Sequence, residues 1–141
     1  MDNFLVSDNA LGVNSQAWAV FYGLKSLHIE MPFNFRCQSK AWYNGRENSI
    51  VLSIYAFPLD RQLNVVCGEC RHSDSLVVDV WESKGVVNPP TWQDKGYEEA
   101  YSNRKSFPCL NVNGACDYIV DRTTSFRENC CLEIDEREKT K

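Results

Sequence analysis

Two cysteines separated by two residues have the spacing in this sequence that is best suited to chemistry. The tetrapeptide Cys67-Gly68-Glu69-Cys70 lies between two runs rich in valine, residues 63–66 and 76–81. A tight turn there would place both sulfurs on one side of the chain, with the separation that a tetrahedral metal ion requires. The same two sulfurs could instead form a redox pair, because cysteines spaced in this way can cycle between thiol and disulfide.

A metal site at this turn needs further ligands. We predict one structural Zn²⁺ held by Cys67, Cys70, Cys109 and Cys116, with His72 as the reserve ligand. The first pair resembles half of a zinc-ribbon site, although this chain lacks the second Cys-x-x-Cys of such a site. Because zinc takes about four ligands at once, its binding would tie the segment around Cys109 to the rest of the domain and contribute to folding.

A thiol-dependent enzyme or redox protein using Cys67, Cys70 or Cys130 is the alternative. Cys-Gly-x-Cys resembles the thioredoxin active site over four residues, but a β-branched run follows it here instead of a helix. The glutamate inside the motif adds negative charge, and such a charge raises the pKa of a neighbouring thiol. Cys130 is a candidate nucleophile with His28 or His72 as its base. Inert, reduced cysteines are the third alternative.

Four antiparallel strands are expected to position the cysteine turn. Apolar residues alternate along Leu27–Cys37, which is typical of a half-buried strand. Asn44-Gly45 predicts a two-residue hairpin turn, and the register that this turn imposes places Phe35 opposite Ile54. Residues 63–67 and 76–81 are the third and fourth strands. In the fourth, Val77 and Trp81 face away from the predicted core, so we expect a further element or a partner to cover them.

The remaining elements complete a mainly β domain. Helical spacing of apolar residues predicts a helix over 16–25, and β-type runs predict two late strands, Cys116–Arg122 and Cys130–Ile134, after a turn at Asn113-Gly114. We therefore expect one domain over residues 1–141: an antiparallel sheet, small barrel or sandwich of about six strands with one short N-terminal helix. Residues 1–14 and 135–141 are expected to be flexible ends.

Residues 83–115 are predicted to form a long loop that is rich in aromatic side chains. Asp94 is expected to cap a short helical turn in which Tyr97 and Tyr101 stack. Two interpretations are open: the aromatics pin the loop onto the sheet, or they form a recognition surface. As partner-binding residues we predict Trp92, Tyr97, Tyr101 and Phe107.

Charge and cysteine content narrow the class of function. The formal net charge of -4 argues against a nucleic-acid partner, and the chain contains no apolar run long enough to span a membrane. Seven cysteines without a secretory signal favour a reducing compartment, the cytoplasm or nucleus. The sequence therefore favours a small intracellular, non-catalytic protein-interaction domain with a structural zinc, of a kind that suits a viral or host-interaction accessory protein.

Overall fold

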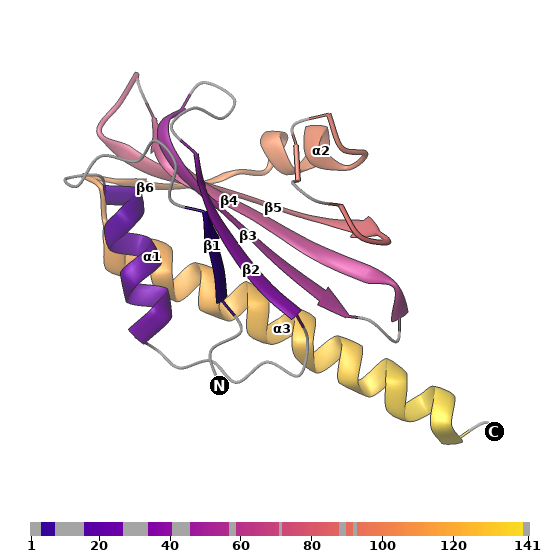
Figure 1. Cartoon of the computed structure of the whole chain (residues 1–141). Helices are drawn as coiled ribbons and strands as arrows, with labels where there is room; N and C mark the ends of the chain where they lie inside the picture. Colours follow the sequence, from indigo (N-terminus) through magenta and orange to yellow (C-terminus); the bar gives the residue numbers. More distant parts are fainter. Residues whose placement is uncertain are drawn as a thin grey trace.

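The computed structural model describes residues 4–7, 16–26, 34–40, 46–56, 59–70, 72–87, 90–91 and 93–139. Four consecutive strands follow the first helix, and the longest helix comes last (Figure 1). In chain order the elements are β1 (Phe4–Ser7), α1 (Gln16–Ser26), β2 (Asn34–Lys40), β3 (Arg46–Ala56), β4 (Arg61–Cys70), β5 (Ser75–Lys84), α2 (Tyr97–Ser102), β6 (Lys105–Pro108) and α3 (Val112–Lys139).

The described strands form one six-stranded sheet in the order β1-β2-β3-β4-β5-β6. β1 runs parallel to β2, and each of the other pairs is antiparallel. The predicted hairpin register is confirmed, because Phe35 pairs with Ile54 and Cys37 with Leu52. Ile54 is fully buried. The Asn44-Gly45 turn and the side chain of Phe35 lie outside the described residues.

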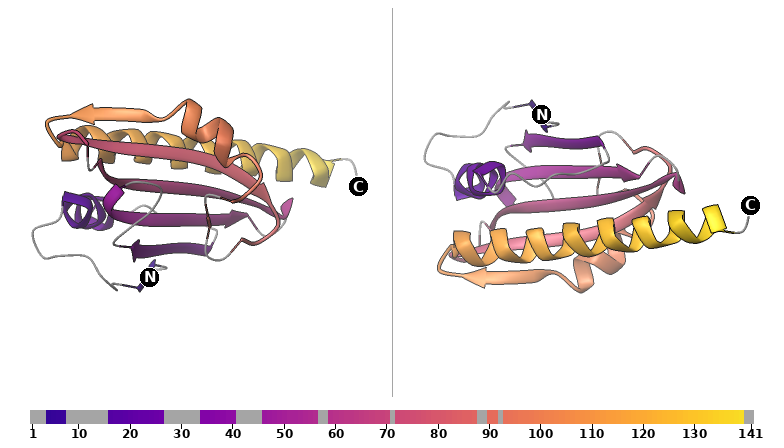
Figure 2. Two further views of the ribbon diagram at one scale, coloured as in Figure 1. Left: turned by 90° about the horizontal axis from the view of Figure 1, so that it is seen from above. Right: turned by 90° about the horizontal axis from the view of Figure 1, so that it is seen from below.

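Two helices cover one face of the sheet and form the main core. Figure 2 shows α3 beneath the half of the sheet that contains β5 and β6, with α1 beside it. This core joins Val20 and Leu24 of α1 to Ile119 and Phe126 of α3, over alternate residues of β3, β4 and β5. The two helices approach closely where Cys116 donates a hydrogen bond to the Val20 carbonyl, at 3.5 Å.

The opposite face carries a smaller core under α2. It consists of Val51, Val66, Trp81, Tyr97 and Ala100, so this short helix is the element that covers the outward apolar residue Trp81. The rings of Trp81 and Tyr97 meet edge to face, with centroids 4.8 Å apart. The predicted contact between Tyr97 and Tyr101 is present, with ring centroids 6.4 Å apart. The helix begins after Gly96, and not at Asp94 as predicted.

The prediction of two strands within 116–134 is wrong, because helix α3 occupies this segment. Asn111 caps the helix: its side-chain oxygen accepts the N–H of Gly114 at 3.0 Å, three residues on. Asn113 and Gly114, which were expected to form a turn, therefore lie in the first turn of this helix. The buried residues of α3 also recur at helical spacing: Ala115, Cys116, Ile119, Thr123, Phe126 and Cys130.

The predicted mainly β, or α+β, class is confirmed in its coarse form. Four of the predicted strands are present as β2 to β5, in one antiparallel arrangement. The prediction of a barrel or sandwich with one short helix is wrong. The described sheet is a single layer, and the longest of the described helices is α3 at the end of the chain. Residues 83–115 contain α2 and β6, residues 4–7 form β1, and residues 135–139 are helical. None of the helices in the described ranges is sufficiently long and apolar to cross a membrane.

Candidate functional site

The predicted cysteine turn is absent, because β4 continues to Cys70. Successive side chains of a strand point to opposite faces, so residues three apart in β4 point apart as well. Cys67 lies in the main core, whereas Cys70 lies on the face that carries α2. Glu69 turns toward α1, where its carboxylate accepts the N–H of Gln16 at 2.8 Å and caps the helix. Cys67, Glu69 and Cys70 of this motif therefore lie in three different environments.

The other predicted zinc ligands are also dispersed. Cys109 is exposed just after β6, Cys116 is buried between α3 and α1, and His72 is exposed in the turn between β4 and β5. Within the part of the chain that the structure describes, no three His, Cys, Asp or Glu side chains are grouped so as to hold a metal ion. The zinc site remains a prediction, to which the described geometry adds no support.

The Cys70 thiol is surrounded by polar groups. The Ser73 hydroxyl hydrogen-bonds to its sulfur, and the backbone N–H groups of His72 and Ser73 and the charge of Arg104 add to the effect, so the pKa of the Cys70 thiol is lowered. Glu69, expected to raise the pKa of the thiols beside it, points to the other face. The lowered pKa favours the thiolate form of Cys70, which is a partly exposed thiol.

Cys130, the other candidate nucleophile, has the opposite character. It lies on α3 and not on a strand, and burial raises the pKa of its thiol. Its sulfur accepts a hydrogen bond from the guanidinium of Arg61 at 3.4 Å, which joins α3 to β4. The geometry indicates a structural role for Cys130. The candidate base His28 lies outside the described residues.

The aromatic residues predicted to bind a partner divide between the two interpretations. Tyr97 and Phe107 are buried, so they attach their segments to the sheet as the first interpretation proposes. Tyr101 is 48% exposed, and Arg104 lies over its ring at 4.2 Å. Trp92 lies outside the described residues. Tyr101 is thus the one predicted recognition residue that the described part of the chain leaves accessible.

A buried carboxylate holds α2 in place. Asp79 on β5 is fully buried and accepts hydrogen bonds from the Tyr97 hydroxyl at 2.7 Å and from the Arg104 guanidinium at 3.2 Å. The two donors stand on either side of α2, one at its start and one just after its end. This network positions the helix over the edge of β5.

The edge of β5 is covered by a strand over only part of its length. β6 pairs with residues Ser75 to Val78 and with no later residue. Preceding β6, the chain turns away at Asn103 and Arg104 into α2. From Asp79 to Lys84, no described strand pairs with β5 on the side away from β4. Half of β5 is thus an edge strand flanked by α2 on one side and α3 on the other.

Two hydrogen bonds reveal which backbone groups of β5 face this open edge. On the β4 side, the N–H of Gly85 donates to the Asp60 carbonyl at 2.7 Å. On the β6 side, the N–H of Cys109 donates to the Asp74 carbonyl at 2.7 Å. Residues of an antiparallel strand alternate in the neighbour to which they direct their N–H and C=O groups. Both hydrogen bonds give the same result: the even-numbered residues of β5 direct their backbone N–H and C=O groups away from β4.

Val80 and Glu82 therefore direct their N–H and C=O groups at the open edge. No described residue forms a backbone hydrogen bond with either of them on this side. Unpaired edge groups of this kind form a template on which another extended chain can add as a strand. The edge has room for such a chain, because it opens into a groove.

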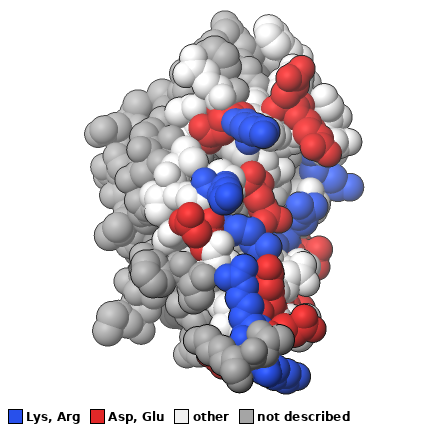
Figure 3. Space-filling view, turned by 90° about the vertical axis from the view of Figure 1, so that its right-hand side faces the viewer, with Lys and Arg blue, Asp and Glu red and all other residues white. Residues whose placement is uncertain are grey.

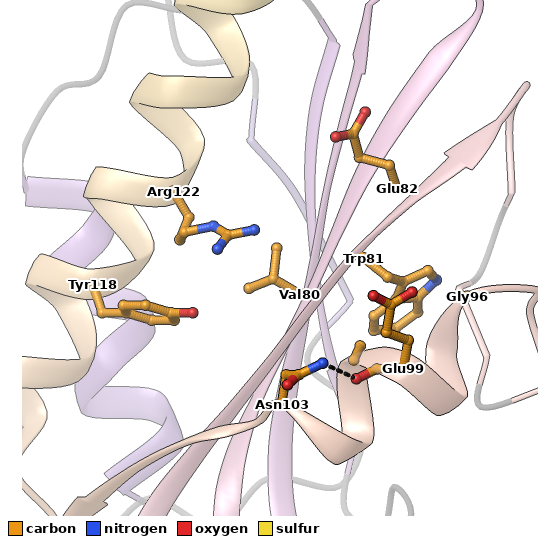
Figure 4. A pocket seen from close by; sticks show the side chains of 9 residues that line it. Val80, Trp81, Glu82, Gly96, Glu99, Asn103, Tyr118 and Arg122 are labelled. Atoms are coloured by element: carbon orange, nitrogen blue, oxygen red, sulfur yellow. Dashed lines mark hydrogen bonds between the residues drawn. The ribbon is translucent and has the colours of Figure 1, made fainter.

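This groove, which we call the β5 groove, has a volume of about 320 Å³. Figure 4 shows Tyr118 and Arg122 extending from α3 toward Val80, with Glu99 on α2 and Asn103 just after this helix. The remaining lining residues are Trp81, Glu82, Gly96 and Ala100.

The polar groups of the β5 groove are largely unengaged. Neither the Arg122 guanidinium nor the Glu99 carboxylate forms an ion pair with another described residue. The indole N–H of Trp81, a residue only 5% exposed, has no hydrogen-bond partner within the described ranges. Glu82 forms a long ion pair with Arg61, in which its Oε1 lies 3.7 Å from the Arg61 Nε. Figure 3 shows acidic and basic side chains interleaved over one side of the molecule.

Sequence reasoning did not identify the β5 groove. The only signal was the outward apolar side chain of Trp81, which indicated that another element or a partner covers this face; α2 does so. Comparison with known proteins adds no candidate: no protein-family model matches the chain, and neither the curated proteins nor the solved structures include a significant match.

Proposed function

We propose that this chain is a protein-interaction domain that binds an extended segment of a partner protein in the β5 groove. The segment would add as a strand to β5, beside Val80 and Glu82. The observation that carries the proposal is the outward direction of the N–H and C=O groups of these two residues, within a groove between two helices.

The walls of the groove support this mode of binding. α2 is held over β5 by the buried Asp79, and α3 is packed into the main core, so both walls are already in place before a partner arrives. A preformed groove lowers the entropy cost of binding a flexible segment. Gly96, which lines the groove before α2, has a positive φ of 97°, a backbone conformation that favours glycine.

Hydrogen exchange measured by NMR tests the proposal. In the free protein, the amides of Val80 and Glu82 should exchange faster than those of Asp79 and Trp81, which face β4. Adding short β-forming peptides of varied sequence should slow the exchange of Val80 and Glu82. If no such peptide protects these two amides, the proposed function is wrong.

A proline variant blocks the edge without removing the strand. Glu82→Pro removes an N–H that faces the groove, and an edge strand tolerates proline at such a position. We expect peptide binding to weaken about tenfold, because a main-chain hydrogen bond is lost and the ring obstructs the approach. Glu82→Ala controls for the lost side chain. Weakening by Glu82→Ala as large as that by Glu82→Pro would contradict strand addition.

A thiol-dependent function is the second candidate, favoured by the lowered pKa of the Cys70 thiol. It predicts a covalent adduct with an electrophilic substrate at Cys70, which mass spectrometry would detect. The intracellular location, the structural zinc and the viral or host-interaction role also stay predictions.

A further inference from the structure

We infer that the segment bound in the β5 groove carries an acidic and a basic residue at adjacent positions, the acidic one facing α3 and the basic one facing α2. This inference rests on the proposed function and names the partner chemistry of the same site. It follows from the alternation of an added strand and from the different charges on the two walls.

An added strand continues the pleat of the strand beside it. Val80 packs against the main core on the α3 side, and Trp81 belongs to the smaller core under α2. Side chains that are opposite one another in neighbouring strands lie on the same face. The partner residue opposite Val80 therefore points toward α3, and the adjacent residue, opposite Trp81, points toward α2.

The α3 wall presents a cation. Arg122 is exposed and extends toward Val80, with the hydroxyl end of Tyr118 beside it (Figure 4). No described residue supplies a carboxylate to Arg122. An acidic side chain opposite Val80 would place its carboxylate next to this guanidinium, which offers several N–H donors in a plane.

The α2 wall presents an anion. Glu99 lines the groove from α2, and its side chain is exposed and without an ion pair among the described residues. A basic side chain opposite Trp81 would reach this carboxylate along the flank of α2. One position further along, Glu82 disfavours an acidic residue opposite itself, because like charges on opposed strands repel.

The expected discrimination is moderate, since both charges are near solvent. Exposed ion pairs contribute little individually, so each matched charge should strengthen binding about threefold and the two together about tenfold. The effect should shrink as salt is added.

Peptide pairs with reversed charge order provide the experiment. The probes are peptides of about eight threonine and valine residues in which the central two are Glu-Lys, Lys-Glu, Glu-Glu, Lys-Lys or Thr-Thr, with binding measured by titration against the full chain. The wild type should bind one mixed order about tenfold more tightly than the Thr-Thr peptide and about threefold more tightly than the like-charged peptides, each of which keeps one matched charge. The double variant Arg122→Glu/Glu99→Lys should prefer the opposite mixed order.

Matched charge changes outside the groove serve as controls. Glu98→Lys lies next to Glu99 on α2, and Lys139→Glu lies in the last turn of α3; neither lines the groove. Both should keep the wild-type preference.

Equal binding of all peptides, with Val80 and Glu82 protected, would overturn the charge pattern and leave the proposed function standing. Absence of protection by any peptide would contradict both. Protection without peptide that grows with protein concentration would assign the groove to a second copy of the chain and also overturn the inference.

Discussion

The hydrogen bond between Tyr97 and Asp79 should be a measurable part of what holds α2 over the β5 groove. Asp79 is fully buried, and its carboxylate accepts from the Tyr97 hydroxyl at 2.7 Å. Tyr97→Phe removes this hydroxyl and keeps the ring in the smaller core. A hydrogen bond to a charged group contributes about 1.5–3 kcal/mol, so we expect a loss of that size in the free energy of unfolding.

Asp79→Ala should cost more, because it removes the acceptor shared by two donors. Breaking a buried charged pair costs about 3–5 kcal/mol when the remaining charge is stranded. The side chain of Arg104 is 24% exposed and can recover some hydration, so the lower end of that range is expected. The double variant should lose about 1.5–3 kcal/mol less than the sum of the single losses, since the bond can be lost only once.

Urea unfolding of the wild type, both single variants and the double variant measures this coupling. Tyr101→Phe is the matched control, because Tyr101 lies on the same helix, is 48% exposed as a residue and donates no hydrogen bond to Asp79. Its effect should stay within about 0.5 kcal/mol. Additive losses, with a coupling below about 0.5 kcal/mol, would refute the role assigned to this bond.

Three further predictions concern the cysteines. As pH falls from alkaline toward neutral, Cys70 should retain its reactivity toward iodoacetamide longer than Cys130, because the pKa of the Cys70 thiol is lowered and that of Cys130 raised; mass spectrometry of each alkylated peptide reports the order, and equal rates would contradict it. Gly23→Ala should destabilise by about 1–3 kcal/mol in urea unfolding, since the new Cβ would lie 2.8 Å from the Cys116 sulfur, and adding Cys116→Ala should restore much of the loss. The zinc prediction expects one zinc per purified chain, lost in Cys67→Ser; a metal-free wild type would contradict it.

The sequence alone determined the central hairpin and the first helix. Asn44-Gly45 and the alternation on both sides of it led to one register, and Phe35 does pair with Ile54. Helical spacing over 16–25 indicated α1, which covers Gln16–Ser26. Both signals are local, because a turn type or a periodic stripe is complete within a few neighbouring residues.

Local signals in the last third of the chain pointed in two directions. Asn113-Gly114 is typical of a hairpin turn, yet Asn111 caps a helix three residues before Gly114. The spacing of Ile119, Thr123 and Phe126 supports the helix, because these side chains need one common face on the main core. The helical period was present in the sequence, and short β-type runs concealed it.

Only the tertiary structure decided the surroundings of the cysteines and the place of the groove. Whether Cys67 and Cys70 share a side depends on whether the chain turns or stays extended between them, and β4 stays extended to Cys70 because β3 and β5 pair with it on both sides. Val80 and Glu82 form an open edge because β6 pairs only as far as Val78. Whether a strand has an unpaired edge depends on where other strands pair with it, so no sequence pattern within β5 could have predicted this edge.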